Sequence, residues 1–425
     1  MKHVTVIGGG IAGLTVAFAL KGKARVTLVE PGPMGGTIQT VKKDGFLVEG
    51  GPDSFLSLKP AAADLCRELG LGGDLVGTQS RKLYVLFHKR LHELPEGFYL
   101  TVPTRILPLM FTPLLSPLGK LRAGMDLILP RGKEGDESLG HFVRRRFGQE
   151  VLDRIAEPLM AGIYVADADR LSMASTFPRL VELEKKSRSL ILAMRKIPPS
   201  VTSPFLTLKG GLGTLVEKLA VELDAKILKG RAIEVGRNMR VMTDQGEIAS
   251  DEVVVATPSH EASRLLKDRE SLSQELVGIP YVSTVTVSLG FRTNRVLDAT
   301  GFVIPKSEKS RLLACTWTST KFAGRAPAGC VLLRCFLVGE PDDPERIARE
   351  EVRDLMGFSQ EPETVVTYRW PAANPVYEVG HAARMARIDA LVPKGIRLVG
   401  SAYRGVGIPD AIKDSRETAA KILAI

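Results

Sequence analysis

Residues 4–30 read VTVIGGGIAGLTVAFALKGKARVTLVE, and this stretch decides the fold. Residues 4–7 form an apolar run of strand length that leads directly into three glycines, and residues 11–20 have the composition of a helix. Residues 25–29 predict a second strand, which ends at Glu30. A strand, a glycine turn, a helix and another strand within about 30 residues predict the βαβ unit that opens a doubly wound α/β fold.

The glycines of this turn have the G-x-G-x-x-G spacing of a dinucleotide site: Gly8, Gly10 and Gly13. The first permits the tight turn, the second lets the backbone approach a pyrophosphate, and the third allows the helix to pack closely on the strand. The phosphates would rest on the helix N-terminus at Ile11 and Ala12, where N–H groups and the helix dipole favour negative charge. Glu30 predicts hydrogen bonds to the ribose hydroxyls and disfavours a 2′-phosphate, which argues against NADP.

Two further glycine turns favour FAD over NAD. Gly35 and Gly36 lie just beyond Glu30, where the backbone would again come close to the pyrophosphate. Residues 49–53, Glu-Gly-Gly-Pro-Asp, form another turn after a predicted strand at residues 45–49. No second glycine fingerprint is complete, because Val216 stands where the third glycine after Gly211 and Gly213 would be needed, so we expect no NAD(P)H site.

The composition and net charge limit the kinds of partner that the chain could bind. The 425 residues, 44% of them hydrophobic, predict more than one lobe with buried cores. A net charge of +10 suits nucleic acid, an anionic membrane surface or a small polyanionic substrate. The basic residues are dispersed, and the run 144–146, Arg-Arg-Arg, is expected to be the solvent-exposed face of a helix, so nucleic acid is the least favoured partner.

The cysteines and histidines predict no metal site. The four cysteines show no CxxC spacing and the six histidines no metal-binding pattern, which is typical of reduced cysteines in a cytoplasmic protein. A strand begins the chain, so we expect no signal peptide.

Residues 103–130 read PTRILPLMFTPLLSPLGKLRAGMDLILP, an apolar stretch broken by five prolines and interspersed with Arg105, Lys120 and Arg122. Prolines make one continuous membrane-spanning helix implausible. Short apolar helices with basic flanks fit a substrate-tunnel wall, a peripheral contact with a membrane or a buried subdomain core, and the sequence leaves these alternatives open.

Four segments carry a family resemblance: GGGIAGL (8–14), GGTIQTVKKDGFLVEGGPDSFL (35–56), EPLMAGIYVADADRLSMASTFP (157–178) and LKGGLGTLVEKL (208–219). Together they resemble the oxygen-dependent protoporphyrinogen and coproporphyrinogen III oxidases, FAD enzymes of haem biosynthesis within the amine-oxidase-like flavoproteins. The resemblance runs through essentially the whole chain in the same order. It implies non-covalent FAD, a porphyrinogen substrate and O2 as the electron acceptor.

The resemblance also implies further cofactor residues. Gly51, Pro52 and Asp53 would face the cofactor, and the backbone of Ile233 would meet the adenine. Trp370 would lie near the isoalloxazine. The segment GSAYRGVGI (400–408) would hold the flavin and ribityl chain through Ser401, Val406, Gly407 and Ile408. Two positions depart from the family pattern, since Thr37 and Gly50 stand where relatives often carry basic residues.

The fold class that follows is α/β: a Rossmann-type FAD-binding domain, an inserted α+β substrate domain and a helical subdomain resembling a membrane-binding one. The expected FAD-binding parts are residues 1–58, 201–265 and 381–425. The expected substrate parts are residues 59–102 and 266–380, and residues 103–200 form the helical subdomain.

The resemblance implies that the substrate lies against Gly162, Ile163 and Tyr164, with Tyr99 nearby. An arginine that pairs with a propionate in some relatives is missing after residues 94–97, so Lys82, Lys89 and Arg90 become candidates. Its absence and the basic charge favour coproporphyrinogen III. Oxidising a porphyrinogen needs little acid–base help, so no catalytic residue is predicted.

Two other functions stay open. One is another amine-oxidase-like flavin oxidase or desaturase, and the other is a non-enzymatic binding protein like the GDP-dissociation inhibitors. A transient contact with a downstream chelatase and a peripheral site on the inner face of the cell membrane are also left open.

Overall fold

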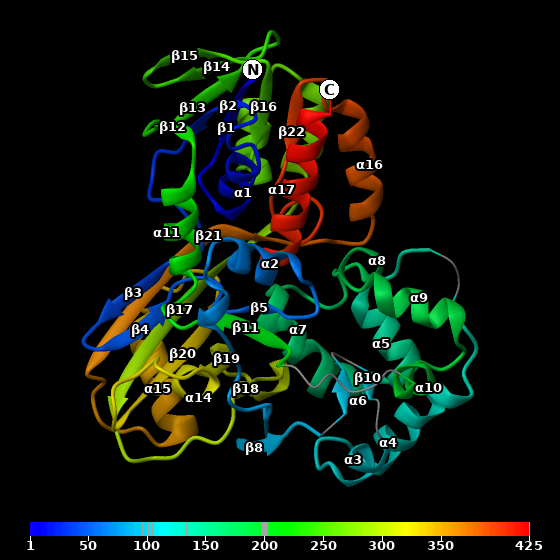
Figure 1. Cartoon of the computed structure of the whole chain (residues 1–425). Coiled ribbons are helices and arrows are strands. Elements are labelled where there is room, and N and C mark those ends of the chain that lie inside the picture. Colours follow the sequence, from blue (N-terminus) through cyan, green and yellow to red (C-terminus); the bar gives the residue numbers. More distant parts are fainter. Residues whose placement is uncertain (96, 100–101, 104–105, 133–134, 197–202, 425) are drawn as a thin grey trace.

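A computed structural model of the chain describes residues 1–95, 97–99, 102–103, 106–132, 135–196 and 203–424. Its upper part in Figure 1, the Rossmann lobe, is built on a parallel sheet in the order β12-β2-β1-β16-β22. These strands are β1 (His3–Ile7), β2 (Arg25–Val29), β12 (Ala225–Leu228), β16 (Glu252–Val255) and β22 (Ile396–Leu398). The order reverses at β1, because β2 pairs on one side of it and β16 on the other.

Both faces of this sheet are buried, as a parallel sheet requires. Val4, Val6 and Leu28 point to one face, where α1 (Ile11–Ala19), α2 (Ala61–Glu68), α11 (Gly213–Glu222) and α17 (Ile408–Leu423) pack. Ile7 and Val29 point to the other. That face is covered by α12 (Ser259–Leu265), α13 (Glu270–Val277), α16 (His381–Leu391) and a small antiparallel sheet of β13 (Ala232–Val235), β14 (Arg240–Thr243) and β15 (Gly246–Ala249).

A second sheet, mostly antiparallel, has the order β21-β17-β20-β19-β18-β7-β8. Its strands are β7 (Tyr84–Phe87), β8 (Arg90–Glu93), β17 (Tyr281–Arg292), β18 (Gly301–Val303), β19 (Leu312–Trp317), β20 (Cys330–Val338) and β21 (Thr364–Pro375). Helix α15 (Pro344–Met356) covers one face with an apolar core. The hairpin β3 (Thr40–Lys43) and β4 (Phe46–Glu49) packs on the opposite face, where Phe46 and Val48 meet Leu332.

Between the lobes, β11 (Phe205–Leu208) pairs with β5 (Phe55–Leu56) and β6 (Leu75–Gly77). A helical region lies beside the second sheet, at the lower right of Figure 1. Its main helices are α3 (Ile106–Phe111), α4 (Pro117–Gly124), α5 (Leu139–Phe147), α7 (Glu157–Tyr164), α8 (Met173–Thr176), α9 (Pro178–Lys186) and α10 (Leu190–Arg195). The region shares one core with Val303 and Ala314 of the second sheet.

The α/β class predicted from sequence is confirmed, with the Rossmann sheet assembled from three separated pieces of chain. The packing bears on where the pieces end. Helix α13 packs in the Rossmann lobe through Leu272 and Leu276, beyond the predicted boundary at residue 265, whereas the β3–β4 hairpin packs against the second sheet. The boundary at residue 200 lies outside the described residues. The remaining domain limits stay predictions.

The expectation that residues 144–146 form a solvent-exposed face is wrong. Arg146 is fully buried and bonds to Asp126 and Glu184. Arg145 bridges Glu137 and Glu184. The three-residue run spans most of a helical turn, so its members cannot all face solvent.

None of the helices in the described ranges is both long enough and apolar enough to cross a lipid bilayer.

Candidate functional site

The glycine turn lies at the carboxyl end of the Rossmann sheet, where the strand order reverses. Gly8 has a φ of +107°, and a Cβ there would lie 2.8 Å from the carbonyl oxygen of Ala256. A Cβ on Gly13 would overlap the carbonyl oxygen of Gly8. Only glycine therefore lets the start of α1 pack this closely on β1, which is the third-glycine role in the fingerprint.

Gly10 has open space where a Cβ would point, and it is the N-cap of α1 without a side chain to cap the helix. Ile11 and Ala12 begin the first turn, whose N–H groups lack partners within an ideal helix. The second glycine pair lies against this turn. The N–H of Gly35 donates to the carbonyl of Gly9 over 2.8 Å, and a Cβ on Gly36 would lie 3.4 Å from the Cα of Gly10. The arrangement fits a pyrophosphate, which needs backbone donors and no intervening side chains.

Glu30 ends β2 beside the same turn. Its carboxylate accepts hydrogen bonds from the N–H groups of Gly9, over 2.7 Å, and Gly32, over 2.8 Å. A carboxylate has about four acceptor sites, so two remain for ribose hydroxyls. Ile233 lies in β13 at a register shift, where the strand pairing skips from Ala232 to Glu234. Arg264 donates to the carbonyl of Ile233 over 3.2 Å.

The turn at residues 50–53 follows the β3–β4 hairpin and is hydrogen-bonded to the second sheet. The carbonyl oxygen of Gly50 accepts from Trp370 Nε1 over 2.8 Å, from Arg334 Nη2 over 2.9 Å and from Thr286 Oγ1 over 3.2 Å. Arg334 Nη2 also donates to the carbonyl of Gly51 over 2.6 Å. Three strands of the second sheet, β17, β20 and β21, thus fix the backbone of the turn that carries Gly51 and Pro52.

The carboxylate of Asp53 is buried and pairs with the ammonium of Lys321 over 2.8 Å. Burial alone would raise the pKa of Asp53, but the charges of Lys321 and Arg334 outweigh it and lower the pKa to about 2. Asp53 is therefore ionised at neutral pH. Its protein partner makes it an anchor for the turn, and we retain a direct contact with the cofactor only as a prediction.

Trp370 is half-buried on β21, and its ring lies parallel to that of Tyr368 with centroids 5.7 Å apart. The ring of Tyr368 occupies the space beside Gly50, because a Cβ on Gly50 would lie 2.7 Å from it. The two rings and the turn form one packed unit.

The C-terminal segment 400–408 lies at the same end of the Rossmann sheet as the glycine turn. Tyr377 holds it from the side. Its hydroxyl donates to the carbonyl of Ser401 over 2.6 Å and accepts from the N–H of Gly405 over 2.8 Å. Val406 is half-buried, and Gly407 is the N-cap of α17 without a capping side chain. Ile408 begins that helix, which packs beside α1, so two helix N-termini lie at this edge (Figure 1).

Three of the four predicted substrate residues, Gly162, Ile163 and Tyr164, lie on α7. Gly162 is exposed and a Cβ on it would lie 3.9 Å from Val303 of β18. The ring of Tyr164 packs edge-to-face on Phe177, with centroids 5.7 Å apart. Burial raises the pKa of Tyr164, and the carboxylate of Asp410 in the first turn of α17 is near enough to raise it further.

Two predicted substrate residues can be located only by their backbone. Ile163 belongs to α7, and Tyr99 pairs with Val102 in a short ladder, but both side chains lie outside the described part of the structure. Of the cationic candidates for a propionate, Lys82 pairs with Asp298 over 3.1 Å. The backbone N–H of Lys89 donates to Glu308, and Arg90 is exposed at the start of β8.

Sequence reasoning missed Arg334, Lys321 and Tyr377. Arg334 and Lys321 come from parts of the chain without a motif, more than 250 residues from the turn that they hold. The one available signal was a lone arginine within the apolar strand CVLLRCFLV, residues 330–338. A charge inside such a strand is rare without a partner.

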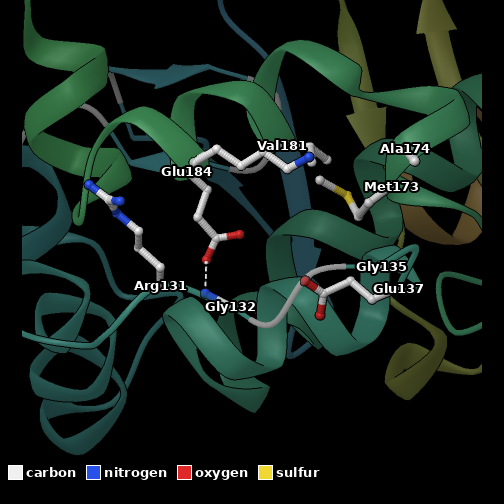
Figure 2. Close-up of a pocket in the computed structure, with 9 residues that line it drawn as sticks. Arg131, Gly132, Gly135, Glu137, Met173, Ala174, Val181 and Glu184 are labelled. Atoms are coloured by element: carbon white, nitrogen blue, oxygen red, sulfur yellow. Dashed lines mark hydrogen bonds between the residues drawn. The ribbon is translucent and has the colours of Figure 1, made fainter.

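A separate pocket lies in the helical region (Figure 2). It is lined by Arg131, Gly132, Gly135, Glu137, Met173, Ala174, Val181, Glu184 and Lys185. The carboxylate of Glu184 accepts from the N–H of Gly132 over 3.1 Å, and Arg145 binds both Glu137 and Glu184. None of the predicted cofactor or substrate residues lines this pocket, so it is distinct from the site above.

Comparisons with known proteins agree with this geometry. The profile of the family described as flavin containing amine oxidoreductase matches residues 11–423. The chain is 39% identical to coproporphyrinogen III oxidase of Bacillus subtilis (strain 168), over 98% of this chain and 96% of that protein. It is 34% identical to coproporphyrinogen III oxidase of Staphylococcus aureus, over 100% of this chain and 99% of that protein.

A crystal structure from Exiguobacterium sp. 255-15, for which protoporphyrinogen oxidase is the proposed function, superposes with a TM-score of 0.91 at 31% identity. The superposition covers 100% of this chain and 99% of that one. The chain is thus an oxidoreductase whose cofactor is a flavin, and it belongs to the flavin-containing amine oxidoreductase family.

Proposed function

We propose that the chain binds FAD non-covalently and oxidises a porphyrinogen in haem biosynthesis. The observation that carries the proposal is the full-length similarity to coproporphyrinogen III oxidases, together with the position of α7 beside the cofactor edge. FAD, with its pyrophosphate and ribose, matches the two glycine turns, the two uncapped helix N-termini and the acceptor Glu30.

Bound FAD would accept a hydride from a meso carbon of the porphyrinogen and pass the electrons to O2, with hydrogen peroxide as the product. The chain's own residues supply position. Gly162 has no side chain on this face of α7, so a flat macrocycle can approach, and the aromatic and aliphatic side chains nearby suit its apolar body.

Neither of the described tyrosines near this edge, Tyr164 and Tyr377, suits the role of general base. Burial raises the pKa of Tyr164 and of Tyr377, so both phenols stay protonated at neutral pH. Loss of the pyrrole protons to solvent is compatible with this, since aromatisation of the macrocycle drives the reaction.

Coproporphyrinogen III is the substrate that we favour. It carries four carboxylates, and a chain of net charge +10 steers an anion toward its surface. The relatives with the highest identities quoted above carry the same substrate in their names.

The test compares coproporphyrinogen III with protoporphyrinogen IX in parallel aerobic assays of the purified yellow protein, read by porphyrin fluorescence. We expect a larger kcat/KM for coproporphyrinogen III. A preference for protoporphyrinogen IX would overturn the substrate assignment and keep the reaction, whereas inactivity with both in a flavin-loaded protein would overturn the reaction.

The alternatives have less support. An amine oxidase needs an open aromatic cage, but Tyr368 and Trp370 stack on each other and Trp370 is tied to Gly50. A non-enzymatic binding protein has no need for Gly8, Gly13 and Glu30, whose geometry here suits a dinucleotide.

A peripheral membrane contact is a second proposal, carried by an apolar patch on the helical region. The patch consists of Phe111, Leu118, Leu121 and Ile128, with exposed fractions of 83%, 77%, 70% and 63%. Lys120 lies within this stretch of sequence and Arg131 follows it, which favours anionic headgroups. The other predicted basic flank, Arg122, instead donates to carbonyls at the end of α5. Helices α3 and α4, which carry Phe111, Leu118 and Leu121, lie at the outer end of the helical region in Figure 1, where a bilayer surface could reach them.

A further inference from the structure

Arg334 has an unusual environment for a charged side chain. It lies in the middle of β20 and is 3% exposed. Its guanidinium lies over the ring of Phe336, 4.8 Å from the centroid, and its Nη2 donates to the carbonyls of Gly50 and Gly51. Its Nε is buried and has no hydrogen-bond partner among the described residues.

The charges around the turn do not balance. Lys321 pairs with Asp53 over 2.8 Å, and Arg325 approaches Glu49 to 3.8 Å. Arg334 forms no ion pair within the described parts of the chain, so three cations face two carboxylates in a largely buried cluster. Isolating a buried cation costs several kcal/mol. Arg334 thus has no carboxylate of its own within ion-pair distance among the described residues, although the nearby charge of Asp53 acts on it.

The position of this cation is informative. Gly50 carries no side chain, and a Cβ there would meet the ring of Tyr368 at 2.7 Å. Because relatives often carry a basic residue at this position, the sequence predicts that the turn has lost a positive charge. In the structure the guanidinium of Arg334 instead reaches the carbonyls of Gly50 and Gly51 from β20. On the neighbouring strands, Ser288 and Thr316 lie opposite Arg334.

We propose that Arg334 is a positioning residue for the flavin site, which fixes the Gly50–Gly51 backbone and gives the cluster beside the bound cofactor its excess positive charge. This rests on the proposed placement of FAD against that turn. A fixed cation near the flavin stabilises the reduced, anionic ring relative to the oxidised neutral one, and so raises its midpoint potential.

The experiment compares two variants of the full-length flavoprotein. Arg334→Gln removes the charge and keeps a donor for the Gly50 carbonyl, whereas Arg334→Lys keeps the charge and loses the planar guanidinium. The readouts are the midpoint potential of the bound flavin, from a reductive dye titration, and the Kd for FAD. Neither needs a porphyrinogen.

Arg334→Gln is expected to lower the midpoint potential and to weaken FAD binding about tenfold, equivalent to about 1.4 kcal/mol. Arg334→Lys should keep the potential close to that of the unmodified protein. Arg146→Met is the matched control, since it removes an equally buried arginine from the helical region. It should lower the melting temperature without shifting the potential.

An unchanged potential in Arg334→Gln, an equal fall in Arg334→Lys, or an equal fall in Arg146→Met would each overturn the proposal. If Arg334→Gln does not fold, Arg334→Lys decides alone: an unchanged potential supports the role of charge, and a fall contradicts it. A chain that binds no flavin would overturn the proposed function as well. A chain that binds FAD but leaves porphyrinogens unoxidised would contradict only the proposed reaction.

Discussion

Single atoms decide whether the dinucleotide turn can form. Gly13 has no room for a Cβ because the carbonyl oxygen of Gly8 occupies that space, whereas Gly124 in α4 has nothing within 4 Å of its Cβ position. The two glycines therefore respond differently to the same substitution.

Gly13→Ala is expected to displace α1 from β1 and to abolish retention of flavin through purification, because the helix N-terminus then moves away from the pyrophosphate. The flavin-to-protein absorbance ratio measures this. Gly124→Ala should keep the ratio, since alanine favours a helix by about 1 kcal/mol over glycine. Full flavin content in Gly13→Ala would contradict the role of the turn.

Asp53 gives the molecule an acid-sensitive anchor. Its folded-state pKa of about 2 lies below the ordinary value of 3.8. The ionised form therefore contributes about 2 kcal/mol to stability above pH 4, and this contribution is lost as the pH falls from 4 to 2.

Asp53→Asn should lower the free energy of unfolding at pH 7 by about 2 kcal/mol and flatten its decline between pH 4 and pH 2. Denaturant unfolding of holoprotein at several pH values measures both effects. An equally steep acid dependence in the variant would assign the decline to other carboxyl groups.

At the scale of elements, Tyr377 connects the helical region to the cofactor segment. The carbonyl of Tyr377 accepts from the N–H of Ser172, while its hydroxyl bridges Ser401 and Gly405. Its ring stacks on His381, with centroids 3.9 Å apart. The segment 400–408 thus has a buried brace, and its geometry depends on one phenol.

Tyr377→Phe should weaken FAD binding severalfold, because two hydrogen bonds of about 1 kcal/mol each lose their partner. Tyr84→Phe is the control, since its hydroxyl bonds to Asp298 on the far edge of the second sheet. Fluorescence titration of FAD gives both Kd values. Equal Kd values for the two variants would show that the brace is dispensable.

The apolar patch makes a prediction at the same scale. The double variant Phe111→Ser, Leu121→Ser should reduce binding to anionic lipid vesicles about tenfold, since it removes apolar surface that would enter the interface. Vesicle co-sedimentation measures the change, with turnover in solution expected to stay constant. Binding unchanged by the double variant would remove membranes as the partner of the patch.

The sequence predicts best those features that depend on residues close together in the chain. The βαβ unit and its glycines are contiguous, so their spacing alone predicts their geometry, and the strand at residues 25–29 matches its predicted range. The brace by Tyr377 and the cation of Arg334 depend on pairing between distant segments, which spacing does not encode. Arg146 was misread for a related reason, since its carboxylate partners lie 20 and 38 residues away.

At the scale of the whole molecule, the proposed site is formed by three parts. The Rossmann lobe would contribute two helix N-termini, the second sheet holds the turn at residues 50–53, and α7 would contribute the wall at Gly162. Each part comes from a different stretch of chain, so the site exists only in the assembled fold. We propose that this assembly transfers electrons from a porphyrinogen to its flavin.

The most direct test is anaerobic mixing of the flavin-loaded protein with coproporphyrinogen III, followed by the visible absorbance of the flavin. Without oxygen, spontaneous oxidation of the porphyrinogen is suppressed. We expect the flavin to bleach on mixing and to recover its colour when oxygen is admitted, with porphyrin formed. A flavin that stays oxidised in the presence of excess porphyrinogen would contradict electron transfer from the porphyrinogen to the flavin.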